Sequence, residues 1–220
     1  MRPYTTMKFI VSIAGFAATL FCTGAYAQSG IAGGGPGDTT IRVNSQYSSE
    51  IDDLKDLLRL ENTEYQKIAF TSPSLVGRNY SIKALEIWYG EVRDSTLLTN
   101  SSNQKPLTDS VFEMRVISKI DEQRNISMQL AMPEAAASKR FATMSNKTTL
   151  YSLRNVVKES KEPVVLNKPF YLMAYILPIP MPDKPGWLSY CNVDDSGEDV
   201  RAWGKELGIP HYIVFEMTFF

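Results

Sequence analysis

Two residues in the C-terminal third have side chains suited to nucleophilic catalysis. Cys191 is one of two cysteines in the chain, and His211 is its only histidine. A thiol beside an imidazole forms a nucleophile with its general base, and the segments that carry the two residues are predicted to be neighbouring strands. No family motif surrounds either residue. The alternative interpretation is a free cysteine buried as a small apolar side chain.

Three glutamates, Glu86, Glu113 and Glu216, lie within predicted strands. Glycoside hydrolases place two carboxylates on either side of the bond that they cleave. However, side-chain alternation puts Glu113 and Glu216 on the faces opposite the apolar rows of their strands, which predicts contact with solvent. We therefore predict no catalytic residue, and a hydrolase with a carboxylate pair or a Cys/His dyad stays an alternative.

A segment that starts at Asn192 begins like a calcium-binding loop. Oxygen-bearing side chains occupy the first, third and fifth positions, as Asn192, Asp194 and Ser196. The twelfth position should hold a bidentate glutamate, and here it is Trp203. Asp194 and Ser196 also suit the start of a helix, where such side chains cap backbone N–H groups. The sequence therefore predicts no bound metal and no cofactor, with these residues as the calcium alternative.

Three aromatic residues, Trp187, Tyr190 and Trp203, are the predicted ligand-binding residues. Their rings are suited to stacking on sugars or to anchoring a protein interface. The alternative is that they pack in the core, as most large aromatic side chains do.

The N-terminus has the pattern of a secretory signal peptide. Arg2 and Lys8 are followed by an apolar run over residues 9–21, and Ala25 and Ala27 occupy the positions read by a signal peptidase. The apolar run is shorter than the roughly 20 residues of a transmembrane helix. We predict a signal peptide over residues 1–27, no transmembrane segment after its cleavage, and a periplasmic, cell-surface or secreted location.

The remaining chain, residues 28–220, is mildly acidic. Loss of two positive charges with the signal peptide changes the net charge from −1 to −3. Because no basic run is present, nucleic acid is not a predicted partner. Cys191 has no second cysteine with which to form a disulfide. Residues 28–38 are predicted to form a flexible glycine-rich leader, and residues 39–220 a single β-rich domain.

The predicted fold class is α+β, dominated by an antiparallel β-sheet or β-sandwich of about eight strands with three short helices. Alternation is clearest in a hairpin with strands over 111–120 and 126–132. The three helices are predicted over residues 49–60, 133–144 and 196–207 from caps and helix-forming residues. Residues 80–92 are predicted to form one long strand, followed by an exposed polar loop over 94–108.

Residues 28–220, notably the segments KALEIWYGEV and DSVFEMRVISKIDEQRNISMQLAMPEAA, resemble exported domains of unknown function that are typical of Bacteroides-like Gram-negative bacteria. The resemblance implies export and assigns no residue a role. The predicted function is that of an exported, non-enzymatic envelope or secreted protein that binds a ligand or a protein partner, either an envelope protein or a glycan. A carbohydrate-binding module that uses exposed Trp and Tyr is the first alternative, and a hydrolase is the second.

Overall fold

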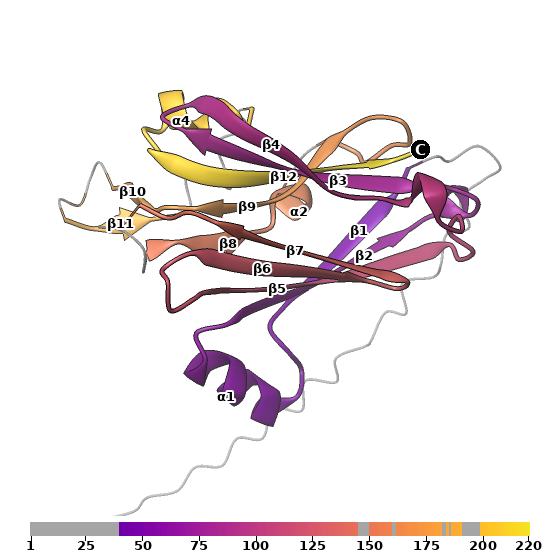
Figure 1. Cartoon of the computed structure of the whole chain (residues 1–220), viewed down its shortest axis with the longest axis horizontal. Coiled ribbons are helices and arrows are strands. Elements are labelled where there is room, and N and C mark those ends of the chain that lie inside the picture. Colours follow the sequence, from indigo (N-terminus) through magenta and orange to yellow (C-terminus); the bar gives the residue numbers. More distant parts are fainter. Residues whose placement is uncertain (1–39, 145–149, 160–161, 182–183, 185, 191–198) are drawn as a thin grey trace, which may run out of the picture. The chain divides into compact units, whose positions relative to one another are not determined.

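The computed structural model of the chain describes residues 40–144, 150–159, 162–181, 184, 186–190 and 199–220. Within these residues twelve strands form two five-stranded sheets and one two-stranded sheet (Figure 1). Every strand pair is antiparallel. The prediction of a β-rich chain dominated by antiparallel pairing is confirmed.

The first sheet has the strand order β1-β2-β5-β6-β7. Its strands are β1 (Arg42–Tyr47), β2 (Glu64–Thr71), β5 (Val111–Ile120), β6 (Ile126–Met132) and β7 (Ala135–Phe141). The second sheet has the order β4-β3-β12-β9-β8. Its strands are β4 (Glu91–Asn100), β3 (Tyr80–Trp88), β12 (His211–Phe219), β9 (Phe170–Ile176) and β8 (Ser152–Arg154).

A small hairpin and short helices complete the described elements. The hairpin pairs β10 (Ile179–Pro180) with β11 (Leu188–Ser189). The α-helices are α1 (Asp52–Leu60), α2 (Val156–Glu159) and α4 (Trp203–Glu206), and the 3₁₀ turns are η1 (Pro73–Leu75) and η2 (Ser101–Asn103). None of the helices in the described part of the chain has the length and apolar character needed to cross a bilayer.

The predicted hairpin of β5 and β6 is confirmed. Val116 lies opposite Leu130 in the pairing, and both side chains are buried. The turn closes through the backbone N–H of Asp121, which donates to the carbonyl of Asn125 at 2.9 Å, while the Asp121 carboxylate accepts from the N–H of Asn125. Alternation of apolar and polar residues was sufficient to define both strands.

The helix predicted over residues 133–144 is wrong, because this segment forms strand β7. The prediction rested on three consecutive alanines, which favour helices when no tertiary contact decides. In the fold, a two-residue turn after Met132 returns the chain to β6, with Ala137 opposite Leu130. Phe141 is then buried at the end of the strand. Pairing with β6 therefore overrides local helix propensity.

The loop predicted over 94–108 is also wrong in its first part, since residues 94–100 belong to β4. The long strand expected over 80–92 ends at Trp88 and turns at Tyr89 and Gly90, whose φ angles are 52° and 78°. Positive φ at both central residues is typical of the two-residue turns that join hairpin strands. β4 lies at an edge of the second sheet and is mostly exposed. Its polar composition is that of an edge strand.

The two other predicted helices meet different outcomes. The first is present as α1, with two aspartates in its first turn and Arg59 in its last. The third, predicted over 196–207, is described from residue 199 onward, and only the four residues of α4 within it are helical. Residues 196–198 lie outside the described residues.

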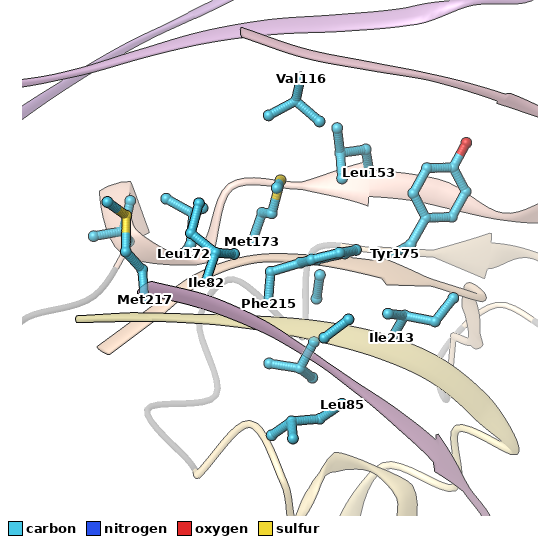
Figure 2. Packing of buried hydrophobic residues seen from close by; sticks show 14 of the residues in the cluster. Ile82, Leu85, Val116, Leu153, Leu172, Met173, Tyr175, Ile213, Phe215 and Met217 are labelled. Carbon is cyan, nitrogen blue, oxygen red and sulfur yellow. The ribbon is translucent and has the colours of Figure 1, made fainter. Parts of the chain in front are cut away.

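Side chains from both five-stranded sheets share one buried cluster. The ring of Phe219 on β12 lies 5.2 Å from the ring of Phe70 on β2 and 5.6 Å from that of Phe112 on β5. Figure 2 shows Met173 and Tyr175 pointing from β9 toward the side on which Val116 of β5 lies. One buried core therefore contains side chains from both five-stranded sheets.

The other face of β12 is also covered, which explains why Tyr212 and Val214 are buried. The Tyr212 hydroxyl accepts a hydrogen bond from the N–H of Gly204 at 3.1 Å and donates to the carbonyl of Arg201 at 3.0 Å. The segment that contains α4 thus packs against this face of the second sheet.

Candidate functional site

Of the three predicted ligand-binding aromatics, Trp187 is the most exposed. Its side chain lies beside β11 and is 64% exposed, and the Lys184 ammonium lies 5.6 Å from its ring centroid. The indole face is therefore available for contact with a ligand or partner.

Tyr190 is half-buried and lies in a polar environment. The guanidinium carbon of Arg154, on β8, is 4.3 Å from its ring centroid, and its hydroxyl donates to the carbonyl of Leu150. Trp203, by contrast, is 3% exposed and packs 6.1 Å from the ring of Tyr212. Its indole belongs to the core and offers no face to a ligand, which matches the core-packing alternative for this residue.

The candidate calcium residues Asn192, Asp194 and Ser196 lie outside the described residues, as does Cys191. Within the described ranges, no group of three or more histidine, cysteine or acidic side chains is placed to hold a metal ion.

His211 is fully buried in a cluster of aromatic side chains. Its ring stacks on Trp88 at 3.9 Å between centroids, and its Nδ1 shares a hydrogen bond with the Tyr151 hydroxyl. Its Nε2 is 3.4 Å from Oε1 of Glu86, which also accepts a hydrogen bond from the Trp88 indole N–H at 2.9 Å. Burial lowers the pKa of His211 to about 4. The imidazole is therefore neutral at pH 7 and packed within the protein.

The three strand glutamates do not form a catalytic pair. Glu113, on the first sheet, forms an ion pair with Lys67 at 2.8 Å. Glu216 is ion-paired with Arg201 at 2.9 Å. In the β12–β3 pairing Glu86 lies opposite Ile213, so Glu86 and Glu216 lie on opposite faces of the second sheet.

A different carboxylate, Glu64, occupies a more unusual position. It begins β2, and its side chain reaches the edge of the second sheet at β8. There it accepts hydrogen bonds from the backbone N–H of Leu153 at 3.0 Å and from the Ser152 hydroxyl at 3.1 Å. The Tyr175 hydroxyl of β9 donates to it as well. Glu64 thus links the two sheets through polar contacts at one end of the core.

Burial raises the pKa of Glu64 above its usual range, and the hydrogen bonds from Tyr175, Leu153 and Ser152 oppose this effect, as does the positive charge of Arg154. Burial, followed by the negative charge of Glu64, also raises the pKa of Tyr175. The tyrosine therefore stays protonated and keeps its donor proton for the carboxylate.

Two buried polar atoms next to Glu64 have no hydrogen-bond partner among the described residues. They are the amide oxygen of Gln66, whose residue is 4% exposed, and Nε of Arg154. Gln66 follows Glu64 on the same face of β2, directly opposite Tyr47 of β1. Buried polar atoms are nearly always hydrogen-bonded in folded proteins. A group of this kind indicates a place where a further molecule supplies the missing partners.

Two tyrosines lie within electrostatic range of Glu64 and Arg154. Tyr47 is 61% exposed, and burial of its hydroxyl, followed by the charge of Glu64, raises its pKa. Tyr190 is likewise within electrostatic range of both Arg154 and Glu64. We call the following residues the Glu64 cluster: Tyr47, Glu64, Gln66, Arg154, Tyr175 and Tyr190.

Of this cluster, only Tyr190 was predicted from the sequence as a ligand-binding residue. A signal for two more residues is present in β2, where Glu64 and Gln66 share the alternation of the buried Ile68 and Phe70. Polar side chains on the buried side of a strand indicate a polar site within the core.

Comparison of the chain with protein-family models, with curated proteins and with solved structures finds no match. The function is therefore inferred from the geometry of the chain itself.

Proposed function

We propose that this protein is an exported, non-enzymatic binding protein whose Glu64 cluster holds a neutral, polyhydroxylated small ligand such as a saccharide. The observation that carries the proposal is that two buried atoms, Gln66 Oε1 and Arg154 Nε, have no partner among the described residues. The Arg154 guanidinium lies against the half-buried ring of Tyr190.

The chemistry of the two atoms defines the ligand. The Gln66 oxygen requires a hydrogen-bond donor, and the Arg154 N–H requires an acceptor. A hydroxyl group supplies both functions, so a ligand with several adjacent hydroxyls satisfies the two atoms together. Leaving either atom without a partner would cost about 1–3 kcal/mol.

Charge and aromatic surface point to the same class. The cluster contains one carboxylate, Glu64, and one guanidinium, Arg154, so it has no net charge with which to select an ion. Tyr47 presents an exposed ring next to Gln66. An aromatic face beside hydrogen-bonding groups suits the apolar C–H faces and polar edges of a sugar ring.

The positions of the side chains that were considered as catalytic candidates support binding rather than catalysis. His211 is neutral, buried and hydrogen-bonded to Tyr151, while Glu113 and Glu216 are held in ion pairs. Catalytic groups need to reach the substrate, and these side chains are engaged elsewhere.

The export and architecture in this proposal rest on separate support. The signal-peptide pattern of residues 1–27 and the resemblance to exported domains support a periplasmic, surface or secreted location. The ring contacts of Phe219 with Phe70 and Phe112 across the two sheets support a β-sandwich.

The proposal is tested by screening residues 28–220 on a glycan array, followed by titration calorimetry with the best saccharide. We expect Gln66→Leu to weaken binding about tenfold, the loss that follows removal of one buried hydrogen bond. Tyr47→Ala should weaken it similarly. The matched control is Tyr89→Ala, because Tyr89 is an equally exposed tyrosine, at 64%, outside the cluster. Absence of saccharide binding, or binding unchanged by Gln66→Leu, would overturn the proposal.

A further inference from the structure

Helix α1 carries apolar side chains that the described protein leaves in solvent. None of its nine residues is buried. The exposed apolar side chains of the helix and its N-cap are Ile51 (65%), Leu54 (37%), Leu57 (54%) and Leu60 (77%). In the chain α1 connects β1 to β2, and Figure 1 shows it standing apart from the strands of both sheets. An apolar helix face without packing indicates an interaction surface.

The helix has few internal sources of stability. Isolated helices shorter than about 12–15 residues are marginal in water, because tertiary packing supplies most helix stability. No side chain caps its N-terminus. Its ion pairs, Lys55 with Asp52 at 2.8 Å and Arg59 with Asp56 at 3.3 Å, are exposed and contribute only a few tenths of a kcal/mol each. A partner that covers the apolar face would supply the missing packing.

Charge identifies the kind of partner. Residues 50–61 contain five carboxylates and two basic side chains, a net charge of −3. This equals the net charge of residues 28–220, so the excess acidity of the mature chain is concentrated in and beside α1. A surface that fits α1 must combine an apolar centre with a positively charged rim.

Three other occupants lack this complementarity. An anionic bilayer surface repels an acidic helix. A second copy of the chain would bring two segments of charge −3 together. The leader, residues 28–38, contains one aspartate, no lysine and no arginine.

We propose that α1 docks into an apolar groove on another protein whose rim carries lysine or arginine, as amphipathic helices do in helix-in-groove complexes. Leu54 and Leu57 enter the groove, and Asp53 lies against its basic rim. The residues of this surface differ from those of the Glu64 cluster. If α1 proved not to dock in this way, the saccharide proposal would be unaffected.

Site-specific photo-cross-linking in the cells that produce the protein tests this docking. A photoreactive phenylalanine analogue replaces Leu57, and mass spectrometry identifies the cross-linked peptide. The matched control places the same group at Val111, an exposed apolar residue of β5 that is 44% exposed. Unchanged thermal unfolding of both variants confirms that the fold is intact.

We expect Leu57 to cross-link to a segment of another protein in which apolar residues are bracketed by lysine or arginine, and Val111 not to do so. Asp53→Lys should reduce the cross-linked yield about tenfold, and Asp53→Asn should reduce it less. A cross-link to a second copy, to residues 28–38 or to lipid would overturn the proposal. So would the absence of a cross-link, or a yield insensitive to Asp53→Lys.

Discussion

The carboxylate of Glu64, on the first sheet, accepts a hydrogen bond from the backbone N–H of Leu153, on the edge of the second, at 3.0 Å. The two residues are 89 positions apart in the chain. Leu153 itself is buried in the core, so its N–H has little access to water at this edge. Glu64 therefore has a structural role between the sheets in addition to its place beside the proposed ligand.

Replacing Glu64 by alanine should lower the free energy of unfolding by about 2–3 kcal/mol, because the N–H of Leu153 and the hydroxyls of Ser152 and Tyr175 lose their acceptor. Glu64→Gln keeps one acceptor oxygen and should cost less. Urea unfolding at pH 7 measures both changes. Equal losses for the two variants would show that the contact with Leu153 contributes little.

The wild-type protein and Glu64→Gln should also differ in how their stability depends on pH. Burial raises the pKa of Glu64 above the usual 4.5, so the stability linked to its protonated form is fully present below that pH and declines as the pH rises through the folded-state pKa. The Gln variant does not titrate at this position. Relative to Glu64→Gln, the wild type should therefore become less stable from pH 4.5 upward, measured as the difference between their urea midpoints. A difference that moves in the opposite direction would contradict the effect assigned to burial.

His211 should produce the opposite pH dependence. Its pKa is lowered by burial from 6.5 to about 4, so the stability linked to its neutral form is complete above pH 6.5 and is lost as the pH falls toward 4. Over that range the loss should reach about 3 kcal/mol. His211→Gln retains a hydrogen-bonding group for Tyr151 without a titrating ring. The wild type should lose stability relative to this variant in acid unfolding, and parallel curves for the two proteins would refute the prediction.

The sequence predicted the elements whose apolar residues alternate cleanly and failed where tertiary pairing decides. The β5–β6 hairpin was defined by its alternation. Ala135–Phe141 favours a helix in isolation and became a strand because β6 supplies a pairing partner. In β4, polar residues predicted a loop because an exposed edge strand does not need an apolar row.

The candidate site was less accessible to sequence analysis than the fold. Glu64 and Gln66 are visible as polar residues on the buried side of β2, but their partners come from β8 and β9. No local pattern places Arg154 near Glu64, because that meeting depends on contact between the two sheets. Trp203 illustrates the opposite error. Its residue type suited a ligand-binding surface, but in the fold it packs on Tyr212 and is buried.

Gly204 should be sensitive to the smallest substitution. A Cβ at this position would lie 2.4 Å from the backbone nitrogen and 2.5 Å from the Cα of Gly90, in the turn between β3 and β4. Backbone atoms cannot yield as a flexible side chain does, so Gly204→Ala should destabilise the protein by about 1–3 kcal/mol. Thermal unfolding measures the change. Lys205→Ala, on the same helix, is the control. If Gly204→Ala changed the stability as little as Lys205→Ala does, this close packing would be contradicted.

Phe219→Ala should test whether the two sheets are held together as a β-sandwich. The ring contacts Phe70 and Phe112 on the first sheet while its own strand belongs to the second, so truncation removes packing between them. We expect a loss of about 3–5 kcal/mol in the free energy of unfolding, the range for a buried aromatic side chain. Trp187→Ala removes a larger but exposed ring and should change stability by no more than about 0.5 kcal/mol. Urea unfolding at pH 7 compares the two variants. A loss for Phe219→Ala below that for Trp187→Ala would contradict a core shared by the sheets.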